Sequence, residues 1–120
     1  MSGKYLLDTC FIIGLQNRNT DALETLKQKS VTLQECAYSV ITRLELLSFP
    51  NLSAIDEAAL NTLLGGMLCL NLSDVIQVET IKIRRRRKVK LPDAMILATA
   101  KAHSLELLTL DQKLIELSLH

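Results

Sequence analysis

Apolar and polar positions follow two patterns along the chain. Four short apolar runs have the composition of buried strands, and they lie at 4–7, 36–40, 67–72 and 105–109. Between them, apolar residues recur every three or four positions, as on one face of a helix. The expected helices lie at 11–15, 21–29, 42–47, 53–64, from 73 into the arginines that follow, 93–103 and 111–117. This alternation predicts an α/β fold with a mainly parallel central sheet flanked by helices.

Polar residues and a proline indicate where several of these helices begin. Asp21 and Ser53 are expected N-caps, and either Ser73 or Asp74 caps the helix that runs into the arginines. Pro92 fits the first turn of a helix, where its missing N–H has no partner to lose. The apolar positions expected on the helix after residue 73 are Val75, Val78, Thr80 and Ile81.

Composition limits what the chain can be. Its 120 residues suit a single domain spanning 1–120, and a hydrophobic content of 48% excludes a disordered protein. Aromatic residues make up only 3%, too few for a platform that stacks nucleic-acid bases. The three cysteines, Cys10, Cys36 and Cys69, are odd in number and far apart, which argues against a disulfide framework or a zinc site. We see no signal peptide and no bilayer-spanning segment, so we expect a soluble, cytoplasmic protein.

Acidic residues lie where the expected strands end. Asp8 ends the first strand, and Asp111 follows the last strand with one residue between them. Asp93 lies in the first turn of the helix before that strand, and Glu45 comes shortly after the second strand. Ligands of open α/β sheets bind outside the carboxyl ends of the strands. We therefore expect these four acids to meet in one crevice.

Four carboxylates in one crevice repel each other unless a counter-charge is present. A hard divalent cation such as Mg²⁺ or Mn²⁺ takes oxygen ligands and supplies that charge. The chemistry that follows is phosphodiester hydrolysis, in which the metal activates a water. The hydroxyl of Thr109, close to Asp111, is suited to hold a ligand or a water.

Each acid also has a structural interpretation. Asp93 could favour the helix dipole, Asp111 could be a turn residue or an N-cap, and Glu45 could lie on a solvated helix. Asp8 is the hardest to explain in this way, because an acid directly after a buried strand is rarely structural. The combined placement of the four favours a shared functional site.

Several segments resemble a PIN domain, with the spacing of the small VapC-type toxin nucleases. They are LLDTCFII, SVITRLELL, LPDAMILATAKAHSLELLTLD and the closing DQKL, and together they span residues 5–114. The most specific part is an acid that opens an alanine-rich helix, followed by a strand that ends in Thr-x-Asp. The resemblance implies a Rossmann-like fold and a Mg²⁺-dependent endoribonuclease. It also implies a homodimer and an antitoxin protein as partner.

The acids of that family match this chain one by one. They correspond to Asp8 in LLDT, Glu45 in TRLELL, Asp93 in LPDA and Asp111 in TLD, as catalytic and metal-binding residues, and the hydroxyl near the fourth acid corresponds to Thr109. The chain departs from the pattern at two positions. Cys10 stands where such domains often have Asn, and Leu114 stands where an aromatic residue is common.

A basic segment precedes LPDA. Half of all basic residues lie in it, namely Lys82, Arg84, Arg85, Arg86, Arg87, Lys88 and Lys90. It has two interpretations: a solvated helix end that complements the helix dipole, or a phosphate grip beside the site made by the four arginines. Without the four site acids, the 13 acidic residues fall to nine against 14 basic ones, which suits a polyanionic substrate.

Two other functions share parts of this pattern. A degenerate PIN domain would keep the fold and act as an RNA-binding or protein-interaction module, but the four intact acids argue against it. A receiver-type signalling domain would have paired acids after the first strand and a phospho-acceptor Asp after the middle one. Here Asp8 stands alone and the middle strand ends in Asn71-Leu72. A phosphatase with a nucleophilic Asp would have a second acid where Cys10 stands.

Overall fold

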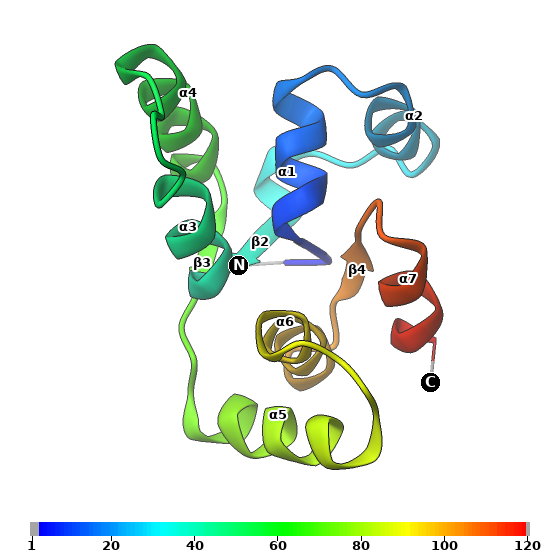
Figure 1. Ribbon diagram of the computed structural model, residues 1–120. Coiled ribbons are helices and arrows are strands. Elements are labelled where there is room, and N and C mark those ends of the chain that lie inside the picture. Colours follow the sequence, from blue (N-terminus) through cyan, green and yellow to red (C-terminus); the bar gives the residue numbers. More distant parts are fainter. Residues whose placement is uncertain (1–2, 120) are drawn as a thin grey trace.

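The computed structural model describes residues 3–119, and its centre is a sheet of four parallel strands (Figure 1). The strands are β1 (Tyr5–Leu7), β2 (Cys36–Ser39), β3 (Leu68–Leu70) and β4 (Glu106–Leu108). Their spatial order is β3-β2-β1-β4. Each of the four apolar runs has thus formed its predicted strand, shorter by one to three residues, and the α/β fold with a parallel sheet is confirmed.

Helices cover both faces of this sheet. They are α1 (Thr9–Gln16), α2 (Thr20–Gln28), α3 (Val40–Leu47), α4 (Ala54–Gly65), α5 (Asp74–Arg86), α6 (Leu91–Ala102) and α7 (Gln112–Ser118), with a 3₁₀ turn at Leu33–Glu35. In Figure 1, α1, α2 and α4 lie above the sheet, α3 lies beside β2 and β3, α6 lies below the sheet with α5 beyond, and α7 lies beside β4. Each predicted helix is present.

The pleat of the strands sends alternate side chains to the two layers. Tyr5 and Leu7 of β1 join the core formed with α1 to α4, whereas Leu6 between them packs against α6. Helix α6 buries Ile96 and Leu97 together with three small residues, Ala94, Ala98 and Ala100. These methyl groups let α6 lie close to both the sheet and α5, which places the N-terminus of α6 near the carboxyl ends of the strands.

Two details of the helices differ from the sequence prediction. The N-cap of α2 is Asn19, whose side chain accepts a hydrogen bond from Ala22 N at 3.0 Å, and the prediction of Asp21 was wrong. Asp21 lies instead in the first turn of that helix, where an acid also complements the dipole. Ser53 and Ser73 are N-caps as expected.

The second difference concerns the face of α5. The buried side chains of this helix are Ile76, Thr80 and Ile83. Of the four apolar positions expected from the sequence, only Thr80 is among them; the exposed ones are Val75, Val78 and Ile81. None of the helices within residues 3–119 is long and apolar enough to cross a membrane.

Candidate functional site

The order of the strands creates a switch point at the carboxyl ends of β1 and β4. The chain passes from β1 to β2 and β3 on one side, then returns to place β4 on the other side of β1. Ligands of open α/β sheets bind where the order reverses in this way. Leu7 pairs with Leu108, so Asp8 and Thr109, the next residue of each strand, lie side by side.

Asp8 is buried at this switch point, with only 2% of its surface exposed. One carboxylate oxygen accepts a hydrogen bond from Phe11 N at 2.9 Å and thereby caps α1. The hydroxyl of Thr109 donates to the other oxygen, and Cys10 Sγ lies 3.2 and 3.4 Å from the two oxygens. Asp8 therefore has a structural role as well, which the sequence argument had considered rare.

Burial raises the pKa of Asp8 above its ordinary value, because the charged form loses its hydration. The hydrogen bonds from Thr109, Phe11 and Cys10 act in the opposite direction and stabilise the carboxylate. The negative charge of Asp93 raises the pKa further.

Glu45 is held in place from the first turn of α1. Thr9 Oγ1 donates a hydrogen bond to Glu45 Oε1 at 2.6 Å and lies 3.2 Å from the hydroxyl of Thr42. Thr9 follows Asp8 directly, so one short stretch of chain fixes both acids. Glu45 is half-buried on α3, and it is not the fully solvated residue of the structural interpretation.

Both acidic and basic neighbours affect the pKa of Asp93. It is half-buried in the first turn of α6, and burial raises its pKa, with the charges of Asp111 and then Glu45 adding to the effect. The positive charges of Lys90 and Lys113 lower it. Among the described residues, no hydrogen bond or ion pair reaches the Asp93 carboxylate. Its oxygens are therefore free to bind an incoming cation.

Asp111 is exposed and serves as the N-cap of α7. Its Oδ1 accepts hydrogen bonds from Lys113 N at 2.9 Å and Leu114 N at 3.4 Å. Its own backbone N donates to Thr109 Oγ1 at 3.0 Å. Thr109 thus joins the first acid to the fourth, since its hydroxyl donates to Asp8 and accepts from Asp111.

In the structure, the charges of Glu45 and Asp111 act on Asp93, and the charge of Asp93 acts on Asp8. In the conformation described, no three His, Cys, Asp or Glu side chains within residues 3–119 stand close enough together to hold a metal ion. The donor set nevertheless fits a hard cation, because it offers carboxylate oxygens that repel each other, one of them free of other partners.

Sequence reasoning missed two polar neighbours of these acids. Thr9 was not identified, although a hydroxyl directly after a strand-end acid could have drawn notice. Lys113 carries no such signal, because its effect on Asp93 depends on how α7 packs against α6. Lys90 was counted only as part of the basic segment, and the structure places its charge beside Asp93.

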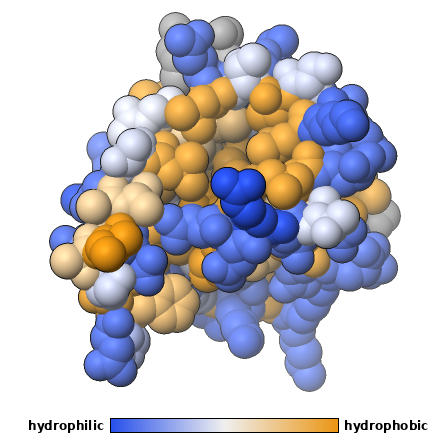
Figure 2. Space-filling model, turned by 90° about the horizontal axis from the view of Figure 1, so that it is seen from above, coloured by the Kyte–Doolittle hydropathy of each residue, from blue (hydrophilic) through white to orange (hydrophobic). Residues whose placement is uncertain are grey.

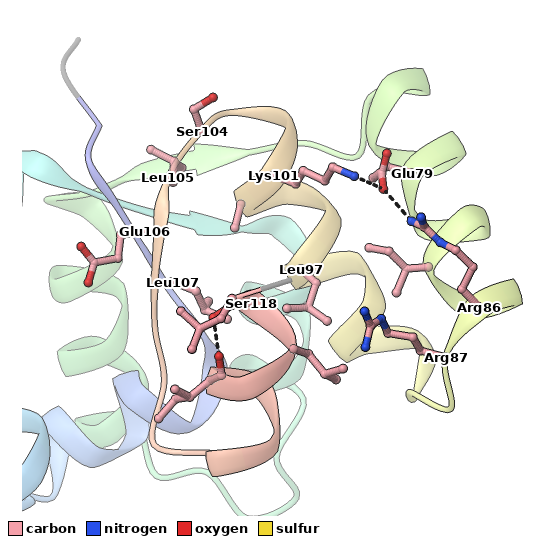
Figure 3. A pocket seen from close by; sticks show the side chains of 15 residues that line it. Glu79, Arg86, Arg87, Leu97, Lys101, Ser104, Leu105, Glu106, Leu107 and Ser118 are labelled. Carbon is pink, nitrogen blue, oxygen red and sulfur yellow. Dashed lines mark hydrogen bonds and ion pairs between the residues drawn. The ribbon is translucent and has the colours of Figure 1, made fainter.

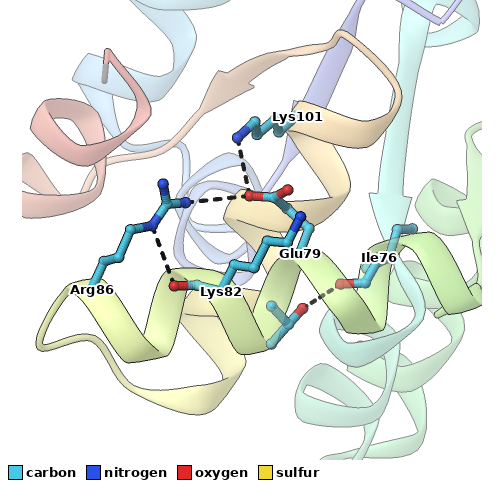
Figure 4. A network of polar contacts seen from close by, with 6 residues as sticks. Ile76, Glu79, Lys82, Arg86 and Lys101 are labelled. Atoms are coloured by element: carbon cyan, nitrogen blue, oxygen red, sulfur yellow. Dashed lines mark hydrogen bonds and ion pairs between the residues drawn. The ribbon is translucent and has the colours of Figure 1, made fainter.

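The four arginines do not act as one group. Arg86 donates from Nε to the backbone oxygen of Lys82 at 3.3 Å, and its Nη2 lies 3.6 Å from Glu79 Oε2 (Figure 4). Glu79 also pairs with Lys101 on α6 at 3.0 Å. The side chains without such a partner among the described residues are Arg84, Arg85 and Arg87, all exposed.

A cavity of about 610 Å³ is separate from the acids. It lies between α5, α6, α7 and β4 and is lined by Leu97, Leu107, Arg86, Arg87 and Lys101, among others (Figure 3). None of the four acids lines it. Size alone therefore does not locate the chemistry, which we assign to the carboxyl ends of the strands.

The fold and the site together define an α/β protein with a cluster of acids at the switch point of its sheet. The family model of the PIN domain matches residues 5–118. The chain belongs to the PIN domain family, whose members are generally nucleases, and it is VapC-like within that family. No curated protein matches the chain.

Three solved structures illustrate the relationship. A chain of a toxin-antitoxin complex from Klebsiella pneumoniae is 32% identical, with a TM-score of 0.78, and the match covers 92% of this chain and 88% of that one. FitAcB from Neisseria gonorrhoeae is 24% identical (TM-score 0.70; 95% and 92% covered). VapBC2 from Rickettsia felis, bound to a promoter DNA fragment, is 19% identical (TM-score 0.74; 93% and 90% covered). The last two similarities concern the fold alone.

Proposed function

We propose that this protein is a divalent-metal-dependent endoribonuclease that hydrolyses RNA phosphodiester bonds. The observation that carries the proposal is the position of Asp93, whose pKa responds to the charges of Glu45 and Asp111 and which in turn affects Asp8. Asp8, Glu45, Asp93 and Asp111 would hold Mg²⁺ or Mn²⁺. PIN-family membership supports the nuclease class.

The residues around the acids have roles that the contacts suggest. A bound divalent cation would lower the pKa of a water and stabilise the leaving oxygen of the phosphodiester. Thr109 holds Asp8 by its hydroxyl and Thr9 holds Glu45, so both carboxylates stay oriented. The ammonium groups of Lys90 and Lys113, near Asp93, offset part of the repulsion between the acids and the phosphate backbone.

The arginines at the end of α5 are the proposed RNA grip. Arg84, Arg85, Arg86 and Arg87 precede the loop that leads to Asp93, and such a cluster attracts a polyanion. Arg86 contributes less than the others, because Glu79 already neutralises part of its charge. The grip therefore rests mainly on Arg84, Arg85 and Arg87.

We further propose that the nuclease is the toxin of a toxin-antitoxin pair, bound by an antitoxin protein, and that it forms a homodimer. The similarity to a chain from a toxin-antitoxin complex supports the first part. Exposed apolar side chains on α3, on α4 and in the loop between them are consistent with a protein partner, namely Leu44, Ile55 and Phe49. Seen from above, apolar side chains surround a hollow on the face where α1, α2 and α4 lie (Figure 2).

Purified protein should cleave single-stranded RNA in millimolar Mg²⁺ or Mn²⁺. The test compares fluorescent RNA and DNA of one sequence, each with metal and with chelator. We expect fragments from RNA with metal, none in chelator, and little or no cleavage of DNA. Cleavage of DNA alone would contradict the RNA assignment. Intact RNA bound by the protein in every condition would favour the degenerate, RNA-binding alternative.

A further inference from the structure

The thiol of Cys10 is in direct contact with the first acid of the site. Cys10 lies in the first turn of α1, two residues after Asp8. Its Sγ lies 3.2 Å from Asp8 Oδ1, 3.4 Å from Asp8 Oδ2 and 3.4 Å from Thr109 Oγ1. Among the described residues, it is the one side chain within hydrogen-bond distance of both oxygens of the Asp8 carboxylate.

Cys10 is also the partner of that carboxylate with the most contact to solvent. Asp8 and Phe11 are fully or almost fully buried, and Thr109 is 8% exposed, whereas Cys10 is only half-buried. Of the three residues that hydrogen-bond to Asp8, Cys10 is therefore the one most open to a cation that arrives from solvent. A cation that binds Asp8 would then have a sulfur atom beside it.

The distances between this sulfur and the two oxygens suit two ligands of one ion. In proteins a Zn–O bond is about 2.1 Å long and a Zn–S bond about 2.3 Å. For angles at the ion between about 90° and 109°, these lengths place the oxygen and the sulfur about 3.1 to 3.6 Å apart. The observed 3.2 and 3.4 Å lie within that range. Asp8 and Cys10 can thus contact one cation without being moved apart.

A sulfur ligand changes which cation such a site prefers. The four acids offer carboxylate oxygens, which suit Mg²⁺ and Mn²⁺. A thiolate is a softer ligand, and it favours Zn²⁺ over Mg²⁺. The other two cysteines lie elsewhere, since Cys36 is buried on β2 and Cys69 lies on β3, two strands away from β1. Any sulfur contribution at the site therefore comes from Cys10.

We propose that Cys10 makes the metal site prefer Zn²⁺ to Mg²⁺. When Zn²⁺ binds, the thiol proton passes to water and a sulfur lone pair binds the cation, with no change of oxidation state. In the metal-free protein the thiol donates to Asp8 instead. Millimolar Mg²⁺ still fills the site when Zn²⁺ is absent. The inference rests on the proposed metal-dependent function and names the cation that its site selects.

Cys10→Ser tests this preference, because it replaces the sulfur by a hydroxyl that can still donate to Asp8. The dissociation constant of Mg²⁺ divided by that of Zn²⁺ should fall by about tenfold or more, as is usual when a residue that supports a metal is replaced. Most of the change should come from weaker Zn²⁺ binding. Both constants follow from melting temperatures of the full chain at a series of metal concentrations. Cys10→Asn, which introduces an amide oxygen, should change the ratio in the same direction and replaces the serine variant if that one is unstable.

The absorption spectrum of the Co²⁺ complex tests the sulfur ligand without an activity assay. Co²⁺ can take the place of Zn²⁺, and a thiolate ligand gives it a near-ultraviolet charge-transfer band that oxygen ligands do not give. We expect the band in wild type and its loss in Cys10→Ser. Cys69→Ser is the matched control, because it removes another half-buried thiol. It should keep both the band and the preference for Zn²⁺.

The metal site and the role of Cys10 fail in different ways. If neither Mg²⁺ nor Zn²⁺ shifts the melting temperature of wild type, the metal site itself is wrong. If both cations stabilise wild type but Cys10→Ser keeps the ratio of constants and the Co²⁺ band, the metal site stands and Cys10 is not a ligand. A band that is lost in Cys69→Ser and kept in Cys10→Ser would place the cation at another thiol, which also contradicts the proposal.

Discussion

Replacing Asp93 by Asn is expected to lower RNA cleavage by about 100-fold or more, equivalent to about 2.7 kcal/mol of activation free energy. The Asp93 carboxylate has no hydrogen-bond partner among the described residues; its charge raises the pKa of Asp8, and the charges of Asp111 and Glu45 raise its own pKa. Asn keeps the shape but removes the anionic oxygen that a hard cation prefers. The fold should be unaffected, since no contact of the acid is lost.

Asp21→Asn is the matched control, because Asp21 is also an acid in the first turn of a helix. Both substitutions remove a favourable interaction with a helix dipole, worth about 0.3–1 kcal/mol, but only one removes a site acid. Initial cleavage rates at saturating RNA and metal, measured for both variants, separate the two effects. Equal rates for Asp93→Asn and wild type would contradict the role assigned to Asp93.

Substituting Arg84 and Arg87 by Gln should weaken RNA binding and reduce its dependence on salt. Each phosphate contact contributes about 0.7 to the slope of log affinity against log salt for a single strand. Losing two contacts should therefore lower the slope by about 1.4. Neither side chain has a partner within the described residues, so the fold should tolerate the change.

The measurement is fluorescence anisotropy of labelled RNA at a series of salt concentrations, with a site variant that does not cleave. Arg18→Gln with Lys27→Gln provides a control with the same loss of charge, beside α2. An unchanged slope in the Arg84→Gln/Arg87→Gln variant would favour the other interpretation of the basic segment, a solvated helix end.

Local signals were enough to predict the elements and the acids at strand ends. The run before Asp8 and the Thr-x-Asp after the last strand place both residues at the carboxyl edge of any parallel sheet. The local pattern does not predict that β1 and β4 are neighbours. Their adjacency depends on the crossover through α5 and α6, and it is what puts Thr109 against Asp8.

Errors arose where two residues compete for one role or where a partner is distant in sequence. Asn19 and Asp21 both suit a helix start, and the turn at Arg18, with φ of 54°, favours the earlier residue as cap. Glu79 pairs with Arg86 on its own helix and with Lys101 on α6, so Arg86 is partly neutralised while its neighbours in the basic segment are not. On α5, the periodicity shows two apolar faces, but it cannot tell which of them packs against α6.

The raised pKa values of Asp8 and Asp93 link the site to folding. A carboxyl whose pKa is higher in the folded protein binds protons more tightly there than in the unfolded chain. The metal-free protein therefore loses stability as pH rises from the unfolded pKa, near 4, through the folded values. The loss is absent in strong acid and complete only above the folded pKa values. Asp93→Asn should remove part of it.

The shift of the melting temperature by metal at neutral pH tests most directly whether the four acids form one metal site. Mn²⁺ at ten times its dissociation constant should stabilise wild type by about 1.4 kcal/mol, or roughly 5 °C. Asp93→Asn should be more stable than wild type in chelator and should lose most of the metal shift, while Asp21→Asn should keep it. If Mn²⁺ shifts neither wild type nor Asp93→Asn, and the two melt alike in chelator, the four acids do not form a metal site.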